Sequence, residues 1–168
     1  MNLFSGLIIQ SSSFTRPGDT TQYTAGDLVA NNTVSSSVTP LSFAAFASRT
    51  QHPAKIRRVR IDKSTSVTAS ATFAVHFYEA SPTQGTSGDN SAILPSARDK
   101  YLGSVSAISV ANRFGDGAAG WGTLAAGAEI CIAYDRTTSG TIYGLVEATA
   151  AYTPGNAEVF KVSVEFTP

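Results

Sequence analysis

The chain is built from short runs in which apolar and polar residues alternate, separated by turn-forming residues. The clearest run lies near the C-terminus, where four alternate positions are apolar: Phe160, Val162, Val164 and Phe166. Polar residues fill the positions between them: Lys161, Ser163 and Glu165. Alternation with a period of two indicates a strand with one face in the core and one in solvent. Helical periodicity is nearly absent, so the sequence predicts an all-β, antiparallel sandwich or barrel.

Further strands are predicted at residues 55–61, 66–79, 101–110, 129–134 and 142–152, with weaker candidates at 3–10, 20–30 and 41–47. The last of these equally suits a short helix. We therefore expect about eight strands, and an eight-stranded jelly roll is the natural architecture, although the pattern leaves the topology open. The length favours one sandwich domain over residues 1–168. Residues 1–10 are either a docking arm or the first strand of that sandwich.

Two local features predict details of strand pairing. A Pro-Gly pair at 154–155 separates the last two predicted strands and fits the central positions of a type II turn. These two strands are therefore predicted to form a hairpin. Upstream, Ile56 is out of phase with Val59 and Ile61, which predicts a β-bulge at residues 57–58, because two residues must face one partner there.

Two connections are predicted to be unusually long, at residues 80–100 and 111–127. The second holds five Gly residues around Trp121. Long loops in a compact domain usually carry function or are partly disordered. Trp121 has two interpretations: it binds a glycan, with Tyr101, Tyr143 and Tyr152 as further aromatic candidates, or it packs down to close one end of the sandwich.

Residues that carry chemistry are few and scattered. His52 and His76 lie far apart in sequence and there is no Cys pair, so no metal site is predicted. His76 falls in the middle of a predicted strand, where a hydrogen-bonded surface residue is expected rather than a general base. Cys131, between Ile130 and Ile132, is expected to be a small buried hydrophobe. No catalytic motif, phosphate loop or dinucleotide fingerprint occurs, so neither an enzyme nor a cofactor is expected.

The composition is unusual in its low charge. Charged residues make up 14% of the chain, against the usual share of about a quarter. Such a surface suits a protein that partners largely cover. No apolar stretch approaches the roughly 20 residues of a membrane span, and the N-terminus lacks the features of a signal peptide. An aqueous, non-secretory setting without a membrane partner is expected.

Half of the basic residues nevertheless fall within fifteen positions: Arg49, Lys55, Arg57, Arg58, Arg60 and Lys63. Nucleic acid would favour such a patch, but the neutral overall balance and the lack of interleaved aromatics argue against a dedicated binder. The segment is then either a solvated strand face that blunts a sheet edge or a docking site for an acidic protein surface.

The distribution of charge along the chain supports docking. Residues 1–100 carry nine basic and six acidic groups, and residues 101–168 carry three and six. Copies of the chain could pair a basic face with an acidic face, with complementary charge setting the register. If this polarity persists in the fold, such pairing would make the protein a homo-oligomer.

Three runs of the sequence resemble small proteins of tailed bacteriophages: TQYTAGDLV at 21–29, IRRVRIDK at 56–63 and AEVF at 157–160. The chain is most similar in size and pattern to the capsid decoration, or cement, class. This resemblance implies a jelly-roll-like protein, dimeric or trimeric, on the capsid surface of the virion. It further implies binding across joints between subunits of the major capsid protein, without enzymatic residues.

On this hypothesis Arg57, Arg58 and Arg60 contact carboxylates of the capsid or of a neighbouring copy. The apolar N-terminal residues Leu3, Leu7 and Ile9 dock as an arm or add a strand to another subunit. The alternative hypothesis is a receptor- or glycan-binding module of a phage tail or fibre, which rests on Trp121 and the two long connections.

Overall fold

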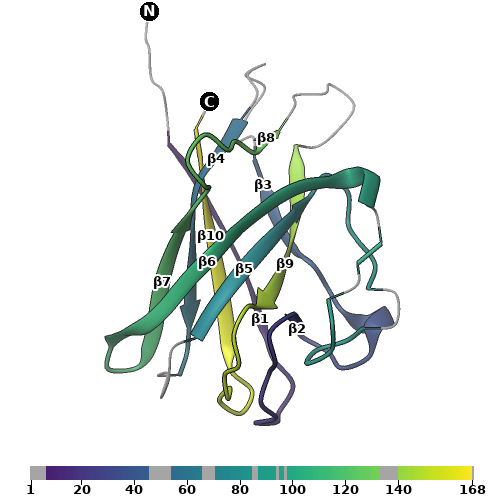
Figure 1. Ribbon diagram of the computed structural model, residues 1–168, viewed down its shortest axis with the longest axis vertical. Coiled ribbons are helices and arrows are strands. Elements are labelled where there is room, and N and C mark those ends of the chain that lie inside the picture. The colour runs from purple at the N-terminus through teal and green to yellow at the C-terminus, as the bar shows by residue number, and fades with distance from the viewer. Residues whose placement is uncertain are drawn as a thin grey trace, which may run out of the picture.

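The computed structural model describes residues 7–45, 54–65, 71–84, 87–93, 95–96, 98–132 and 140–167. These residues form ten strands and two short 3₁₀ helices (Figure 1). The strands are β1 (Ile8–Thr15), β2 (Asp27–Val29), β3 (Leu41–Ala44), β4 (Ala54–Lys63), β5 (Ala71–Tyr78), β6 (Tyr101–Phe114), β7 (Gly117–Thr123), β8 (Cys131–Ile132), β9 (Thr141–Ala148) and β10 (Val159–Thr167). The 3₁₀ helices are η1 (Ser35–Ser37) and η2 (Arg98–Lys100). The prediction of an all-β, antiparallel fold is confirmed.

The strand pairing is nested: the first strands pair with the last, and the pairs then run inward along the chain to β5 and β6. The chain thus forms one long antiparallel hairpin. The first strand pairs with the last, β2 and β3 pair with β9, β4 pairs with β7, and β5 pairs with β6. This long hairpin wraps around the core, which brings β10 beside β4 and β9 beside β5. Two connected strands that roll up together in this manner make a jelly roll.

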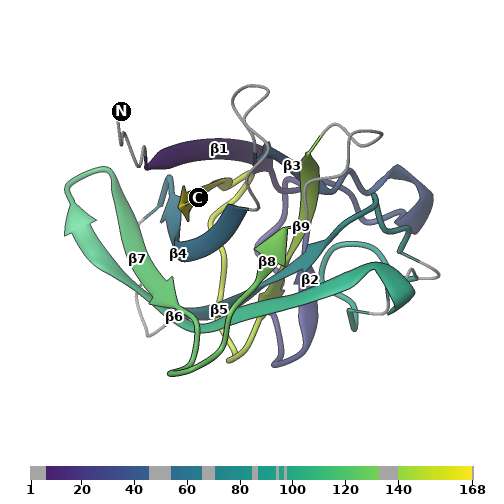
Figure 2. The same cartoon turned by 90° about the horizontal axis from the view of Figure 1, so that it is seen from above.

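The long strand β6 joins the two halves of the roll. Its first part pairs with β5, and its last residues pair with β7. Viewed from above, the single sheet curls around a common interior, with β1 and β4 on one side and β5 and β6 on the other (Figure 2). One half thus has the order β1-β10-β4-β7, and the other has β6-β5-β9-β2.

The inward face of β10 matches the prediction from alternation. Phe160, Val162, Val164 and Phe166 are all fully buried in the main core. The opposite face is open to solvent only in part: Lys161 is exposed as predicted, whereas Ser163 and Glu165 are buried. β10 is a central strand between β1 and β4, so side chains of both neighbours lie over it.

The predicted bulge in β4 is confirmed, whereas the prediction that the last two strands form a hairpin is wrong. Glu165 pairs with Arg58 and Phe166 pairs with Ile56, which leaves Arg57 as the extra residue. In contrast, β10 pairs with β1 and β4, whereas β9 pairs with β2, β3 and β5. The 149–158 segment therefore crosses from one half of the sandwich to the other. Gly155 also lacks the positive φ that a type II turn requires.

The glycine-rich segment around Trp121 is a strand, not a long loop. β6 extends to Phe114, Gly115 and Asp116 form a turn, and β7 follows at once. Close packing explains the glycines: a Cβ on Gly120 would lie 2.2 Å from the Ser109 carbonyl oxygen, and one on Gly122 would lie 2.5 Å from Ile108 Cγ1. The composition that suggested a loop instead permits β6 and β7 to approach each other.

Cys131 is exposed, so its prediction as a buried hydrophobe is wrong. Its neighbours Ile130 and Ile132 are both buried. Because successive side chains of an extended segment point to opposite faces, burial of both isoleucines turns the thiol outward. The long connection predicted at 80–100 is confirmed, since η2 is the one helix or strand that its described residues form. The long connection predicted at 111–127 is wrong, because β6 and β7 occupy most of it.

Two buried ion pairs lie at one end of the roll. Asp89 Oδ2 accepts a hydrogen bond from Arg16 Nη2 at 2.8 Å, and Asp89 Oδ1 accepts one from Tyr23 Oη at 2.6 Å. Lys63 pairs with Glu158, which also accepts a hydrogen bond from Tyr152 Oη at 3.1 Å. The rings of Tyr23 and Tyr152 stack at a centroid distance of 5.1 Å and join the two pairs.

Candidate functional site

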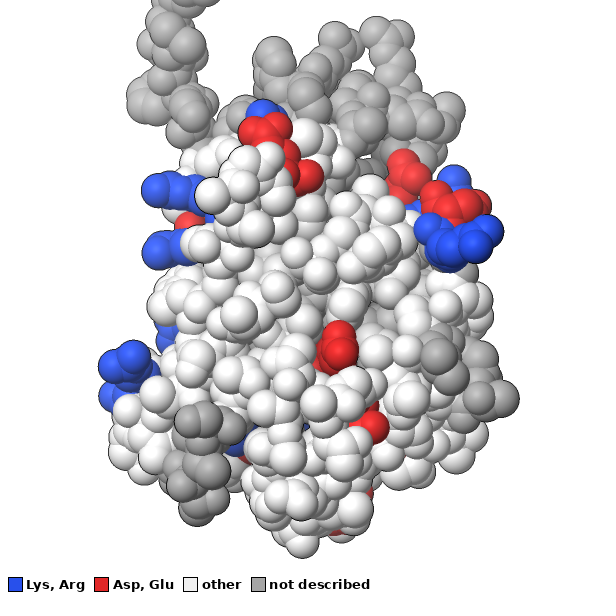
Figure 3. All heavy atoms as spheres, viewed as in Figure 1, with Lys and Arg blue, Asp and Glu red and all other residues white. Residues whose placement is uncertain are grey.

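The strongest candidate is the outward face of β1, β10, β4 and β7, where the predicted basic strand lies. Arg58 and Arg60 project outward from β4, since they alternate with the buried residues Val59 and Ile61. In the sheet register Arg60 stands opposite Trp121 of β7. Lys and Arg side chains gather along the edge of the molecule formed by β4 and β7, while much of the front face is free of charge (Figure 3).

Trp121 forms the centre of this basic surface. Its side chain is 46% exposed. The guanidinium carbon of Arg58 lies 4.1 Å from the centroid of the indole ring, and that of Arg60 lies 5.3 Å from it. Stacking of arginine on tryptophan is the strongest of the cation–π contacts and holds both partners in place. Trp121 thus neither closes an end of the sandwich nor lies in a loop.

Arg58 and Arg60 each also form an ion pair with a carboxylate. Arg58 Nε lies 2.6 Å from Oε2 of Glu165, whose side chain is almost completely buried. That oxygen accepts no well-aligned hydrogen bond among the described residues, so the charge of the Arg58 guanidinium group is the main term that offsets the cost of burying the carboxylate. Arg60 Nε donates to Asp62 Oδ1 at 2.9 Å. The two arginines are consequently ordered before any partner binds.

The remaining basic residues of the segment occupy three different environments. Arg57 is exposed at the bulge and makes no ion pair within the part of the chain that the structure describes. Lys55 is exposed and pairs with Glu129 at 2.8 Å, a contact that raises the pKa of Lys55 and lowers that of Glu129. Lys63 is buried against Glu158, and burial lowers its pKa, so it is not available to a partner. Arg49 lies outside the described residues.

The apolar N-terminal residues lie beside the arginines. Ile9 is in β1 and stands opposite Glu165, which in turn stands opposite Arg58. Its side chain is 56% exposed, and that of Leu7 is 45% exposed. Ile9 therefore belongs to the first strand of the sandwich, and only residues before β1 remain for an arm. Leu3 lies outside the described residues.

We call this set of exposed residues, together with half-buried Arg60, the docking surface: Leu7, Ile9, Arg57, Arg58, Arg60 and Trp121. Sequence reasoning found its arginines and its apolar residues as separate features but placed Trp121 in a loop. One signal for the strand was present, because small residues at 118, 120 and 122 alternate with Ala119, Trp121 and Thr123. A period of two with small inward residues is typical of a strand packed closely on its neighbour.

The comparison with protein families matches the chain to none of them, and the comparison with curated proteins also finds no match. No helix formed by the described residues is long and apolar enough to cross a membrane. Those same residues contain no group of three or more His, Cys, Asp or Glu side chains that could hold a metal ion.

Proposed function

We propose that this chain is a structural virion protein of a tailed bacteriophage that binds the outer surface of the capsid and stabilises contacts between major capsid subunits. The observation that carries the proposal is the docking surface, which joins exposed apolar side chains to an ordered arginine–tryptophan cluster. Tryptophan and arginine are the residue types that most often dominate the binding energy of protein interfaces. The jelly-roll fold and the low overall charge are compatible with this role.

The chemistry of the docking surface favours an acidic protein partner over nucleic acid. Two of its three arginines already contact carboxylates, Glu165 and Asp62, which lowers the net positive charge available to phosphates. Arg57 and the unused donors of Arg58 and Arg60 remain for carboxylates of the capsid or of a second copy. Ile9 and Leu7 add apolar area at the rim of this cluster. Dimers or trimers of the chain would use the same complementarity of charge.

The alternative, a receptor- or glycan-binding module of a tail or fibre, draws less support from Trp121 than expected. A glycan-binding tryptophan needs a ring face that a sugar can cover. Here two guanidinium groups lie against the indole. We therefore assign Trp121 to protein docking and propose no enzymatic role for this surface.

The test is binding of the purified protein to capsids that lack it, measured by co-sedimentation. Trp121→Ala and Arg57→Glu each alter the docking surface without removing an ion pair between described residues, so both should fold normally and lose at least tenfold in affinity. Arg98→Glu is the matched control, since this exposed arginine lies in η2, in the other half of the sandwich. Equal occupancy by all four proteins would overturn the proposal.

Arg58 needs a different substitution. Reversal of its charge would place a second carboxylate beside buried Glu165 and destabilise the fold itself. The informative variant is Arg58→Gln combined with Glu165→Gln, which removes the cation and the buried anion together.

A further inference from the structure

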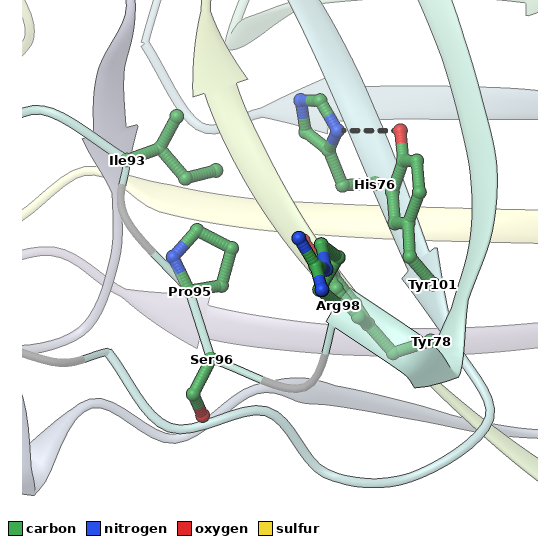
Figure 4. A pocket seen from close by; sticks show the side chains of 7 residues that line it. All are labelled: His76, Tyr78, Ile93, Pro95, Ser96, Arg98 and Tyr101. Atoms are coloured by element: carbon green, nitrogen blue, oxygen red, sulfur yellow. Dashed lines mark hydrogen bonds between the residues drawn. The ribbon is translucent and has the colours of Figure 1, made fainter.

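A second site lies on the opposite side of the sandwich. His76 of β5 alternates with the core residues Val75 and Phe77 and so faces outward from the half that does not carry the docking surface. Beside it is a pocket of about 330 Å³. This volume is at the lower end of the range for small-molecule sites. Figure 4 shows Ile93 and Pro95 on one side of the pocket and His76 and Tyr101 on the other.

The polar wall of the pocket is held rigidly. Glu147 Oε2 lies 2.6 Å from His76 Nε2, and Tyr101 Oη lies 3.0 Å from His76 Nδ1. Because a carboxylate only accepts, Nε2 carries a proton, and a second hydrogen bond joins Nδ1 to the Tyr101 hydroxyl. The phenol is fixed in orientation although its side chain is 41% exposed, and its oxygen keeps a free acceptor position.

Aromatic and aliphatic side chains form the remaining wall of the pocket. The ring of Tyr78 lies 5.3 Å from that of Tyr101 at an interplanar angle of 52°, so the two rings form a tilted pair. Tyr78 is buried, and burial raises its pKa to about 12, which keeps its hydroxyl neutral. Ile93 and Pro95 supply aliphatic contacts on the other side. Arg98 lines the pocket as its one cation among the described lining residues, and Ser96 adds a hydroxyl.

We propose that this pocket binds a single pyranose unit of a glycan and favours a sugar that carries a carboxylate. Pyranoses present C–H faces that pack on aromatic and aliphatic walls and hydroxyls that hydrogen-bond to fixed polar groups, which are the two kinds of surface found here. The planar fork of Arg98 suits a carboxylate. This inference does not depend on the docking surface: a protein attached through that surface would present the pocket away from its attachment side.

The experiment is a titration of the isotope-labelled full chain with four sugars, followed by amide chemical-shift changes. Galactose is paired with galacturonate, and glucose with glucuronate, so that each pair differs only in oxidation at C6. We expect Kd values of a few mM for the better sugar, on the order expected for a ligand of about twelve heavy atoms. Shifts should map to β5, to the start of β6 and to Ile93, Ser96 and Arg98, and the uronate should bind several-fold more tightly.

Variants separate this site from other sources of shift change. Tyr101→Ala should weaken binding at least tenfold, and Arg98→Gln should remove the preference for the uronate. Phe114→Ala is the matched control, since it removes an exposed aromatic at the other end of β6. Absence of shifts with all four sugars, shifts that persist in Tyr101→Ala, or shifts that map to Trp121 would each overturn the inference. None of these outcomes bears on capsid binding, which is scored separately.

Discussion

Asp89 holds the 80–100 segment against the body of the sandwich, and Asp89→Asn is the sharpest test of how the fold is stabilised. The carboxylate accepts hydrogen bonds from Arg16 Nη2, Tyr23 Oη and the Ala30 backbone N–H, all within 2.6–2.8 Å. The side chains of Asp89 and Arg16 are both 0% exposed. An asparagine of the same shape can keep the two bonds to Oδ1 and replaces Oδ2 by a donor.

The cost of this change follows from the buried cation that remains. The new Nδ2 group would face Arg16 Nη2, so two donors would oppose each other and the guanidinium would lose its closest anion. Removal of one partner from a buried ion pair costs about 3–5 kcal/mol. Asp19 Oδ1 lies 3.5 Å from Arg16 Nη2 and compensates in part, which favours the lower end. We expect a loss of about 3 kcal/mol, or about 6–12 °C in Tm for a chain of this size.

The measurement is urea-induced unfolding followed by circular dichroism, with linear extrapolation to water. Asp99→Asn, at an exposed aspartate of η2, is the matched control and should change the free energy of unfolding by less than about 0.5 kcal/mol. Arg16→Met in the Asp89→Asn background should recover part of the loss, because it removes the uncompensated charge. A loss below about 1 kcal/mol for Asp89→Asn would show that buried Arg16 does not depend on this carboxylate.

Three further predictions concern stability and reactivity. Gly120→Ala should destabilise the fold strongly, because the added Cβ meets backbone, whereas Gly115→Ala, which meets nothing within 4 Å, should be nearly neutral in the same unfolding assay. Because burial raises the pKa of Tyr78, the contribution of its neutral hydroxyl to the free energy of unfolding is complete below the unfolded pKa of about 10. That contribution is lost as the pH rises towards 12. Relative to Tyr78→Phe, the wild type should therefore lose about 1.4 kcal/mol of stability between pH 9 and 11, and a constant difference would contradict this. Cys131 should react with a thiol reagent in the folded protein as fast as a free thiol, and slow reaction that requires denaturant would show that it is buried.

The features predicted correctly from the sequence depend on neighbours along the chain. The inward face of β10 follows from alternation, and the bulge at Arg57 follows from a break in the phase of one strand. Both are properties of a single strand, so a single strand is enough to reveal them. The all-β class follows from the repetition of such strands.

The features predicted wrongly depend on which strands become neighbours. β9 and β10 are consecutive in sequence but lie in different halves of the roll, and turn chemistry at 154–155 carries no information about that crossing. Lys63 and Glu165 are buried because elements distant in sequence cover them. The contact of Trp121 with Arg58 and Arg60 likewise depends on the register between β4 and β7. None of these relations is encoded in local composition.

The proposed capsid-binding role can be tested directly by electron cryomicroscopy of phage capsids to which the purified protein has been added. We expect icosahedrally ordered density for the jelly roll on the outside of the capsid, at joints between major capsid subunits. The outward face of β1, β10, β4 and β7 should lie against the capsid, with Trp121 and Arg58 at the contact. Density confined to the tail, or a capsid-bound jelly roll with this face turned to solvent, would contradict it.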